Sequence, residues 1–209
     1  MTTANANASS SERLRLARGG TWLICVLLGA ATLAVYWPVR HFEFLNYDDN
    51  DGIVHILSGQ ITGTVYVWTP RKGFSEVPGT ELSGDNGLLA SKDGHWLFVN
   101  DFGRKRVYKA PLDRSGEITH VDTDFRPDNL RWGPDGKIIA TGQFVDLNNR
   151  NDLHGWAAVK IDTETMKAEP YLKVAGTAAF DNGTTTLPVG KSLYIGTYRG
   201  DRVMVIAAP

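Results

Sequence analysis

The stretch DNGLLASKDGHWLFVN, residues 85–100, decides the fold of this chain. A second stretch, PDNLRWGPDGKIIATG at residues 127–142, repeats its pattern. Each copy has a polar Asn/Asp step, a short apolar strand, an Asp-Gly turn and a second apolar strand. Asp-Gly between alternating runs indicates a hairpin, because glycine supplies the positive φ that a two-residue turn needs. The turn glycines Gly94 and Gly136 lie 42 residues apart. Such a period with strand-turn-strand content predicts a β-propeller.

Short alternating runs separated by Gly, Pro, Asn and Asp continue through residues 53–209, so we expect an all-β body of about four blades. An Asn/Asp-rich insertion at residues 144–154 predicts a loop on one face. The first hairpin is expected to join residues 55–58 to 64–68. Further strands are expected at residues 74–77, 106–110, 118–121, 156–162, 168–172, 191–197 and 202–206.

Bulk properties exclude several classes of function. The formal net charge of −1 and the pI near 6.5 give no electrostatic case for nucleic-acid binding. The lone Cys25 excludes an internal disulfide framework and a Cys-rich zinc site.

The N-terminal quarter of the sequence differs from the rest. Residues 1–20 are polar with scattered arginines, which predicts a disordered basic segment. Residues 21–39 carry no charge and have tryptophan or tyrosine near both ends, as in a short membrane span. Arginines precede the run, and an acidic linker at residues 40–52 follows it. This asymmetry places the N-terminus in the cytoplasm and the body on the extracytoplasmic side of the membrane.

Three interpretations fit residues 21–39: an uncleaved signal anchor, which we favour, a cleaved signal peptide, and a buried helix of a soluble protein. Residues 20–51 also resemble the start of multi-span membrane glycosyltransferases, in which an Asp-Asp pair follows the first transmembrane helix. Here Asp48 and Asp49 occupy that place, but no further span follows them. We therefore interpret them as part of the linker and expect no glycosyl transfer. A join between two unrelated reading frames is the alternative.

Polar residues recur at one position of the repeat. Asn86, Asp128 and Asn182 each lie eight residues before a turn glycine, the last of which is Gly190. The innermost strands of propeller blades line a central channel, so equivalent positions form a ring. Asn and Asp oxygens suit Ca²⁺, which takes six to eight oxygen ligands. The alternative is that these are ordinary turn residues; the neighbouring Asn129 or Asp181 are further candidate ligands.

Several motifs resemble the gluconolactonase/regucalcin-like superfamily of calcium-dependent propellers, which includes paraoxonase-type arylesterases and strictosidine-synthase-like proteins. The Asp-Asn pair at Asp128 and Asn129 is similar to the paraoxonase-like branch. The resemblance covers about residues 55–209. The motifs are LSGDNG (82–87), SKDGHWLFVN (91–100), RPDNLRW (126–132), GTTTLPVG (183–190) and YIGTYRGDR (194–202).

This resemblance implies a six-bladed propeller, a channel calcium ion and hydrolysis of small-molecule lactones or esters. It implies that Asn86, Asp128 and Asn129 bind the metal and that Asp128 also acts as the catalytic base. Asn182 and Thr185 are expected to line the substrate pocket. For Asn182 this expectation rests only on its spacing of eight residues from Gly190.

The sequence also departs from that family. Six blades need roughly 240 residues at about forty residues each, and residues 53–209 supply four blades at most. The calcium-binding Glu and catalytic His of the family's early blades have no match, and His55, His95, His120 and His154 fit no catalytic pattern. We therefore expect a membrane-tethered part of a lactonase/esterase-like hydrolase with an incomplete site, or, as the alternative, a non-catalytic binding propeller. Self-association through open blade edges is also expected.

Overall fold

A computed structural model describes residues 24–34, 50–113, 115–149 and 153–209. The chain divides into two units, residues 1–46 and 47–209. In the first unit, residues 24–34 form a helix with exposed side chains. Among the described residues, no helix is both long and apolar enough to cross a membrane. The transmembrane helix expected over residues 21–39 is thus unsupported, and both of its ends lie outside the described residues. The basic segment at residues 1–20 and most of the linker also lie outside them.

The second unit begins with helix α2 (Asn50–Leu57), so the strand expected at residues 55–58 was wrong. Ile53, Ile56 and Leu57 recur at the i, i+3, i+4 spacing of a helix, and the last two are buried. A window of four residues was too short to separate this period from that of a strand. The helix ends at Gly59, which has a φ of 80° and donates its N–H to the Ile56 carbonyl.

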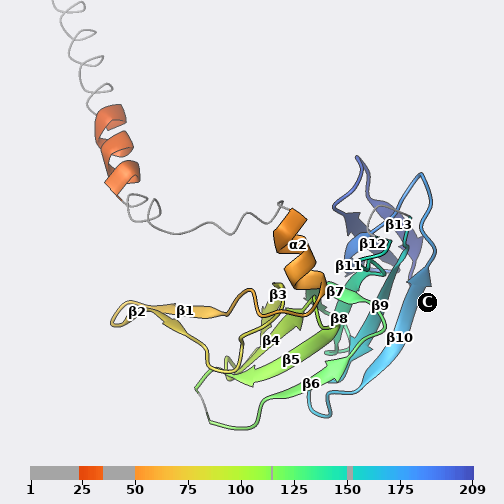
Figure 1. The fold of residues 1–209 in the computed structure, drawn as a ribbon, viewed down its shortest axis with the longest axis horizontal. Coiled ribbons are helices and arrows are strands. Elements are labelled where there is room, and N and C mark those ends of the chain that lie inside the picture. The colour runs from red at the N-terminus through yellow and green to blue at the C-terminus, as the bar shows by residue number, and fades with distance from the viewer. Residues whose placement is uncertain (1–23, 35–49, 114, 150–152) are drawn as a thin grey trace, which may run out of the picture. The chain divides into compact units, whose positions relative to one another are not determined.

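The rest of the unit consists of four antiparallel sheets, each built from consecutive strands (Figure 1). A mostly β body with a propeller-like succession of four sheets is therefore confirmed, although it begins with α2 and the sheets have two, four, four and three strands in chain order. The first sheet holds β1 (Tyr66–Thr69) and β2 (Gly73–Glu76). The second holds β3 (Asp85–Ala90), β4 (Trp96–Asp101), β5 (Arg106–Pro111) and β6 (Thr119–Asp122). The third holds β7 (Arg126–Trp132), β8 (Ile138–Gln143), β9 (Trp156–Ile161) and β10 (Ala168–Val174). The fourth holds β11 (Gly183–Val189), β12 (Ser192–Thr197) and β13 (Met204–Ala207).

The predicted turn chemistry is confirmed at three hairpins. Gly94, Gly136 and Gly190 have φ values of 74°, 80° and 60°, which L side chains rarely adopt. These glycines connect the first two strands of the second, third and fourth sheets. The repeat seen in the sequence is thus a repeat of hairpins.

Apolar side chains fill the three spaces between successive sheets. Val65 and Val77 next to the first sheet pack against Leu97 and Val99 of the second. Between the second and third sheets the core contains Phe98, Val107, Leu130, Ile138, Ala140, Ile161 and Met166. Between the third and fourth it contains Trp156, Phe180, Leu193 and Ile195. Each sheet therefore buries a face against the next one in the series.

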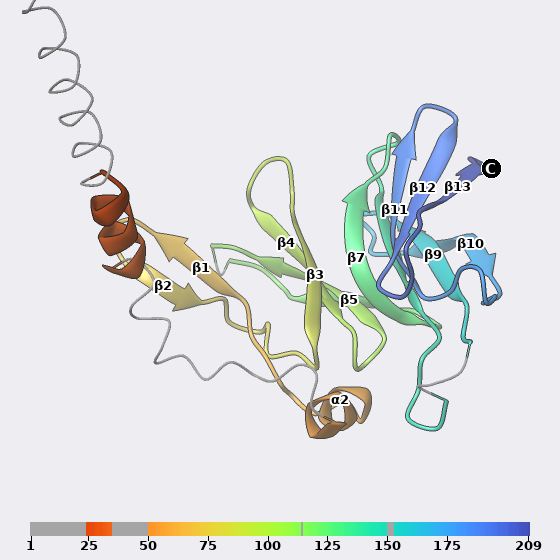
Figure 2. The ribbon, with the colours of Figure 1, turned by 90° about the horizontal axis from the view of Figure 1, so that it is seen from above.

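The first strands of the sheets face one another. β3 contacts β7, and β7 contacts β11, as the view from above shows (Figure 2). This is the arrangement that the propeller interpretation required of β3, β7 and β11. The residues at one end of these three strands are therefore brought together from distant parts of the sequence.

A single buried guanidinium connects α2 to the sheets. Arg126, at the start of β7, donates to the Val145 carbonyl at 2.6 Å and to the Leu57 carbonyl at 3.3 Å. It also donates to the Gly103 carbonyl and to an Asp146 carboxylate oxygen, the latter at 2.7 Å. Arg126 thus fixes the turn after β4, the loop after β8 and the end of α2 against β7.

Candidate functional site

The three inner strands share an irregularity near their first residues. The pairing register shifts between Asp85 and Leu88 in β3, and between Pro127 and Asn129 in β7. It shifts again between Gly183 and Thr185 in β11. Each shift inserts one extra residue, and such bulges change the direction of the neighbouring side chains. The polar repeat noted in the sequence therefore coincides with a repeated bulge.

The bulge in β7 carries Asp128, whose carboxylate is surrounded by amides. Asn129 Nδ2 donates to Asp128 Oδ1 at 2.8 Å, and Gln143 Nε2 donates to Asp128 Oδ2 at 2.8 Å. Asn86, from the bulge of β3, also makes a side-chain hydrogen bond to Asp128. We call these four residues the Asp128 cage. The structure thus brings together all three residues that the sequence assigned to the metal, Asn86, Asp128 and Asn129.

Burial controls the ionisation of the cage carboxylate. Removal from water raises the pKa of Asp128, and the hydrogen bonds from Gln143 and Asn86 offset only part of that rise. The carboxylate therefore binds a proton more readily than an exposed aspartate does. A cation next to it would replace the lost hydration and favour the ionised form.

Two carbonyl groups of β11 extend the cage to the fourth sheet. Asn129 Nδ2 also donates to the Thr184 carbonyl at 3.1 Å. Gln143 Nε2 donates to the Gly183 carbonyl at 3.2 Å. The cage thus lies where β3, β7 and β11 meet, with backbone oxygens of β11 beside the amides.

The structure places Asn182 beside the cage and not in it. Asn182 is fully buried with a φ of 51°, and its amide donates to Asp181 Oδ2 at 2.9 Å. Asp181 in turn accepts from the backbone N–H groups of His154, at 3.2 Å, and Gly155, at 2.7 Å. Asp181 and Asn182 therefore hold the chain before β11 against the loop before β9. In the fourth sheet, the bulge residue equivalent to Asp128 is Thr184.

Several buried polar atoms near these bulges lack a hydrogen-bond partner. They include Thr185 Oγ1, Asn182 Oδ1 and both amide atoms of Asn100. Asn100 Nδ2 lies close to Gly87 in the bulge of β3: a Cβ there would come within 2.8 Å of it and 2.4 Å of the Asp128 carbonyl oxygen. Such orphaned groups call for a bound ion, ligand or water. Thr185, expected to line a substrate pocket, thus has a hydroxyl without a protein partner.

Burial and the charges of Asp181 and Asp128 affect the pKa of the Tyr198 hydroxyl. Burial chiefly raises the pKa of Tyr198, Arg199 partly counteracts it, and the charges of Asp181 and Asp128 raise it further. The side chain is 58% exposed. The phenol is thus only partly removed from water.

The donor set of the cage fits a calcium ion in composition. Asn86, Asp128 and Asn129 offer a carboxylate and two amide oxygens, and the Thr184 and Gly183 carbonyls lie alongside. An amide that donates to Asp128 exposes its oxygen when it rotates by half a turn. Within the described residues, no group of three or more His, Cys, Asp and Glu could hold a metal ion. Any metal here would therefore depend on the single carboxylate of Asp128 together with amide, backbone and water oxygens.

The four described histidines have other surroundings. His55 Nδ1 lies 2.6 Å from Gln60 Oε1, and His120 Nε2 lies 3.9 Å from Asp122. His95 is exposed in the turn before β4, and His154 Nε2 is buried without a partner. Within the described part of the chain, the Asp128 cage thus contains no imidazole.

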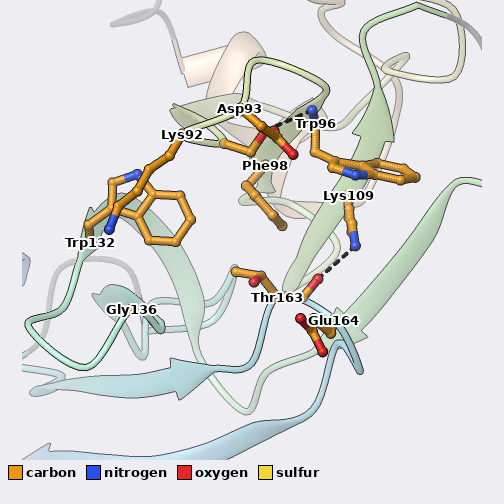
Figure 3. Close-up of a pocket in the computed structure, with 10 residues that line it drawn as sticks. Lys92, Asp93, Trp96, Phe98, Lys109, Trp132, Gly136, Thr163 and Glu164 are labelled. Carbon is orange, nitrogen blue, oxygen red and sulfur yellow. Dashed lines mark hydrogen bonds between the residues drawn. The ribbon is translucent and has the colours of Figure 1, made fainter.

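A pocket of about 390 Å³ lies at the opposite ends of β3 and β7, between the second and third sheets (Figure 3). Its ammonium groups are already engaged. Lys109 Nζ lies 4.3 Å from the centre of the Trp96 ring and donates to the Thr163 carbonyl at 2.7 Å. Lys92 Nζ lies 5.5 Å from the centre of the Trp132 ring. We assign no chemistry to this pocket.

Sequence reasoning missed Gln143 and Tyr198. Gln143 pairs with Arg126 in the β7–β8 register, two residues before Asp128. Pairing the two strands residue by residue from the turn at Gly136 could have placed the Gln143 amide near Asp128. Tyr198 follows β12 and lies within the motif at residues 194–202, but the resemblance assigned it no role.

The sequence matches no known protein family and no curated protein. Among solved structures, the chain is similar to a streptogramin B lyase, with a TM-score of 0.39 and 17% identity over 72% of this chain. It is also similar to a protein of Bacteroides uniformis named as a 6-phosphogluconolactonase, with a TM-score of 0.36 and 14% identity over 71% of this chain. The chain spans 54% of the first protein and 62% of the second. Likeness at this distance assigns no activity.

Proposed function

We propose that the Asp128 cage is the calcium-dependent centre of a lactonase- or esterase-like hydrolase. The observation that supports the proposal is the convergence of Asn86, Asp128 and Asn129 from two strands. The sequence motifs of a calcium-dependent hydrolase superfamily predicted these same residues. A partly buried carboxylate beside side-chain amides, whose oxygens face it after rotation by half a turn, provides the oxygen donors that a hard cation needs.

In this mechanism Asp128 is the ligand or the general base. A bound calcium ion would polarise the lactone or ester carbonyl and stabilise the negative charge that develops on its oxygen. Burial raises the pKa of Asp128 in the metal-free chain, and a calcium ion beside it would oppose that rise and keep the carboxylate ionised, as a proton acceptor must be. Asn129 and Gln143 hold one carboxylate oxygen each and so fix its orientation. The Tyr198 phenol can donate a hydrogen bond to a substrate oxygen.

A direct test is hydrolysis of simple lactones and aryl acetates by the purified full-length chain. With calcium we expect turnover that a chelator abolishes, and the Asp128→Ala variant should lose at least about 100-fold in rate, as is typical for a general base. Asp124→Ala removes a carboxylate that pairs with Lys173 at 3.0 Å on the surface, and it should leave the rate unchanged. Turnover that survives both the chelator and Asp128→Ala would refute the proposal.

A second candidate function is a non-catalytic calcium-binding propeller. It is favoured by the composition of the cage, which has one carboxylate and no imidazole among the described residues. Such a centre binds a cation but has few groups for proton transfer. Calcium binding without hydrolysis of any lactone or ester would support this function over the first.

We also propose that residues 21–39 anchor the body on the extracytoplasmic side of a membrane. The support is the uncharged run with its preceding arginines. Alkaline extraction of membranes from expressing cells should leave the full-length chain in the pellet, and protease added outside the intact inner membrane should digest the body. Release into the alkaline supernatant would argue against the anchor.

A further inference from the structure

The two outermost sheets of the series each leave one apolar face uncovered. In the first sheet Trp68 pairs with Phe74 across the hairpin, next to Tyr66. These three side chains are 57%, 71% and 55% exposed, respectively. We call them the hairpin face. The opposite side of the same hairpin, at Val67, packs against the second sheet.

The fourth sheet has a matching face. Leu187, Tyr194 and Val205 lie side by side across β11, β12 and β13 in the strand register. Val189 lies two residues further along β11, and all four are between 40% and 52% exposed. We call them the terminal face. The alternate residues Leu193 and Ile195 point the other way and are fully buried against the third sheet.

The series itself indicates what covers these faces. Every other space between neighbouring sheets is filled by apolar side chains from both sides. In repeating folds a unit buries its apolar face against the next unit of the same kind. Among the residues that the structure describes, no further sheet covers the hairpin face or the terminal face. The surface that fits the terminal face is therefore another sheet of this series.

We propose that two copies of this chain associate head to tail, the hairpin face of each copy against the terminal face of the other. A two-fold axis then relates two identical contacts and closes the assembly. Two copies of four sheets supply eight, which is within the range of about four to eight blades in closed propellers. Trp68 and Tyr66 would pack against Leu187, Tyr194 and Val205 of the terminal face, and aromatic side chains of this kind are often the residues that dominate interface energetics. This proposal is independent of the Asp128 chemistry.

Sedimentation velocity of the full-length chain tests the contact. We expect a dimer whose dissociation constant increases at least about tenfold in Trp68→Glu and equally in Leu187→Glu, since each removes an anchor from the same pair of faces. Leu153→Glu is the matched control, because Leu153 is 58% exposed but lies outside both faces. Circular dichroism of each variant verifies that the sheets persist. A wild-type monomer, or a dimer unaffected by both face variants, would overturn the proposal. The second outcome would place the contact elsewhere, for example in the N-terminal residues that all variants share.

Cross-linking tests the head-to-tail orientation. In a Cys25→Ser background, one chain carries Tyr66→Cys and another carries Ser192→Cys, which lies between Val189 and Ala207 in the sheet register. A short bis-maleimide should join the two chains only when both are mixed. Cross-linked dimers of either variant alone would show like faces in contact and would contradict the arrangement.

Discussion

The chemistry proposed for this fold depends on the side chain of Asp128. It is partly buried, and side-chain amides donate to both of its carboxylate oxygens. Burial leaves a carboxylate with less hydration than it has in water, so the free energy of the ionised form is raised. A bound cation would relieve that cost. This is why the same residue serves as a candidate ligand and a candidate base.

Calcium affinity should therefore depend on pH through Asp128. Because burial raises its pKa above the ordinary value of 3.8, protons begin to compete with calcium at a higher pH than they would at an exposed aspartate. Affinity should be greatest where Asp128 is fully ionised and should decline as the pH falls through the raised pKa. Titration calorimetry at a series of pH values measures this. An affinity that is constant down to pH 4 would show that Asp128 does not bind the ion.

In the metal-free chain, the contribution of Asp128 to the free energy of unfolding should decrease as the pH rises, whereas calcium affinity should increase. A carboxyl whose pKa is higher in the folded than in the unfolded chain favours folding most below the unfolded value of 3.8. That contribution is lost as the pH rises through the folded-state pKa. Calcium should consequently stabilise the chain more at pH 7 than at pH 4. Thermal unfolding with calcium and with a chelator at both pH values checks the sign.

Because Gly87 has no side chain, β3 and β7 can approach each other closely. A Cβ at this position would lie 2.4 Å from the Asp128 carbonyl oxygen and 2.7 Å from Asn129 Cα, both of them backbone atoms. Gly87→Ala should thus separate the strands, cost about 1–3 kcal/mol of unfolding free energy and weaken calcium binding at least tenfold. In the control Gly94→Ala the new Cβ meets nothing within 4 Å, and only the turn is strained. Chemical denaturation and calorimetry separate the two effects, because the control should keep its calcium affinity.

At the scale of elements, Arg126 determines how α2 and the loops lie against β7. Its guanidinium satisfies carbonyls of Leu57, Gly103 and Val145 at once. Arg126→Met removes these donors while keeping much of the side-chain volume, and each buried carbonyl left unsatisfied costs about 1–3 kcal/mol. We expect a loss of about 3 kcal/mol or more, measured by urea denaturation. Arg131→Met, on the exposed side of the same strand, should change the stability by less than about 0.5 kcal/mol. Equal losses in the two variants would contradict this role.

The elements that the sequence predicted well are those with a strong local signal. The hairpins at Gly94 and Gly136 combine turn chemistry with alternating strands, and both were confirmed. The α2 segment failed because His55 to Ser58 is too short to show a period, and its helical face becomes apparent only when Ile53 is included.

At the scale of the whole molecule, the blade repeat predicted that Asn86 and Asp128 would meet, because equivalent positions of inner strands face one channel. The repeat failed to place Asn182, since the bulge in β11 falls on Thr184 and leaves Asn182 beside Asp181. Gln143 was missed because it comes from the second strand of its sheet. Counting residues back from a turn glycine locates a position on one strand. The cage, however, combines residues from two strands of the third sheet with residues from the neighbouring sheets.

The most direct test of the account is a calcium titration of the full-length chain by calorimetry at neutral pH. We expect one saturable site per chain that is lost in Asp128→Asn and weakened at least tenfold in Asn86→Ala and Asn129→Ala, whereas Asp124→Asn should bind calcium as the wild type does. Saturable binding that persists undiminished in Asp128→Asn, or a wild-type chain that binds no calcium, would contradict the claim that the cage is a calcium centre.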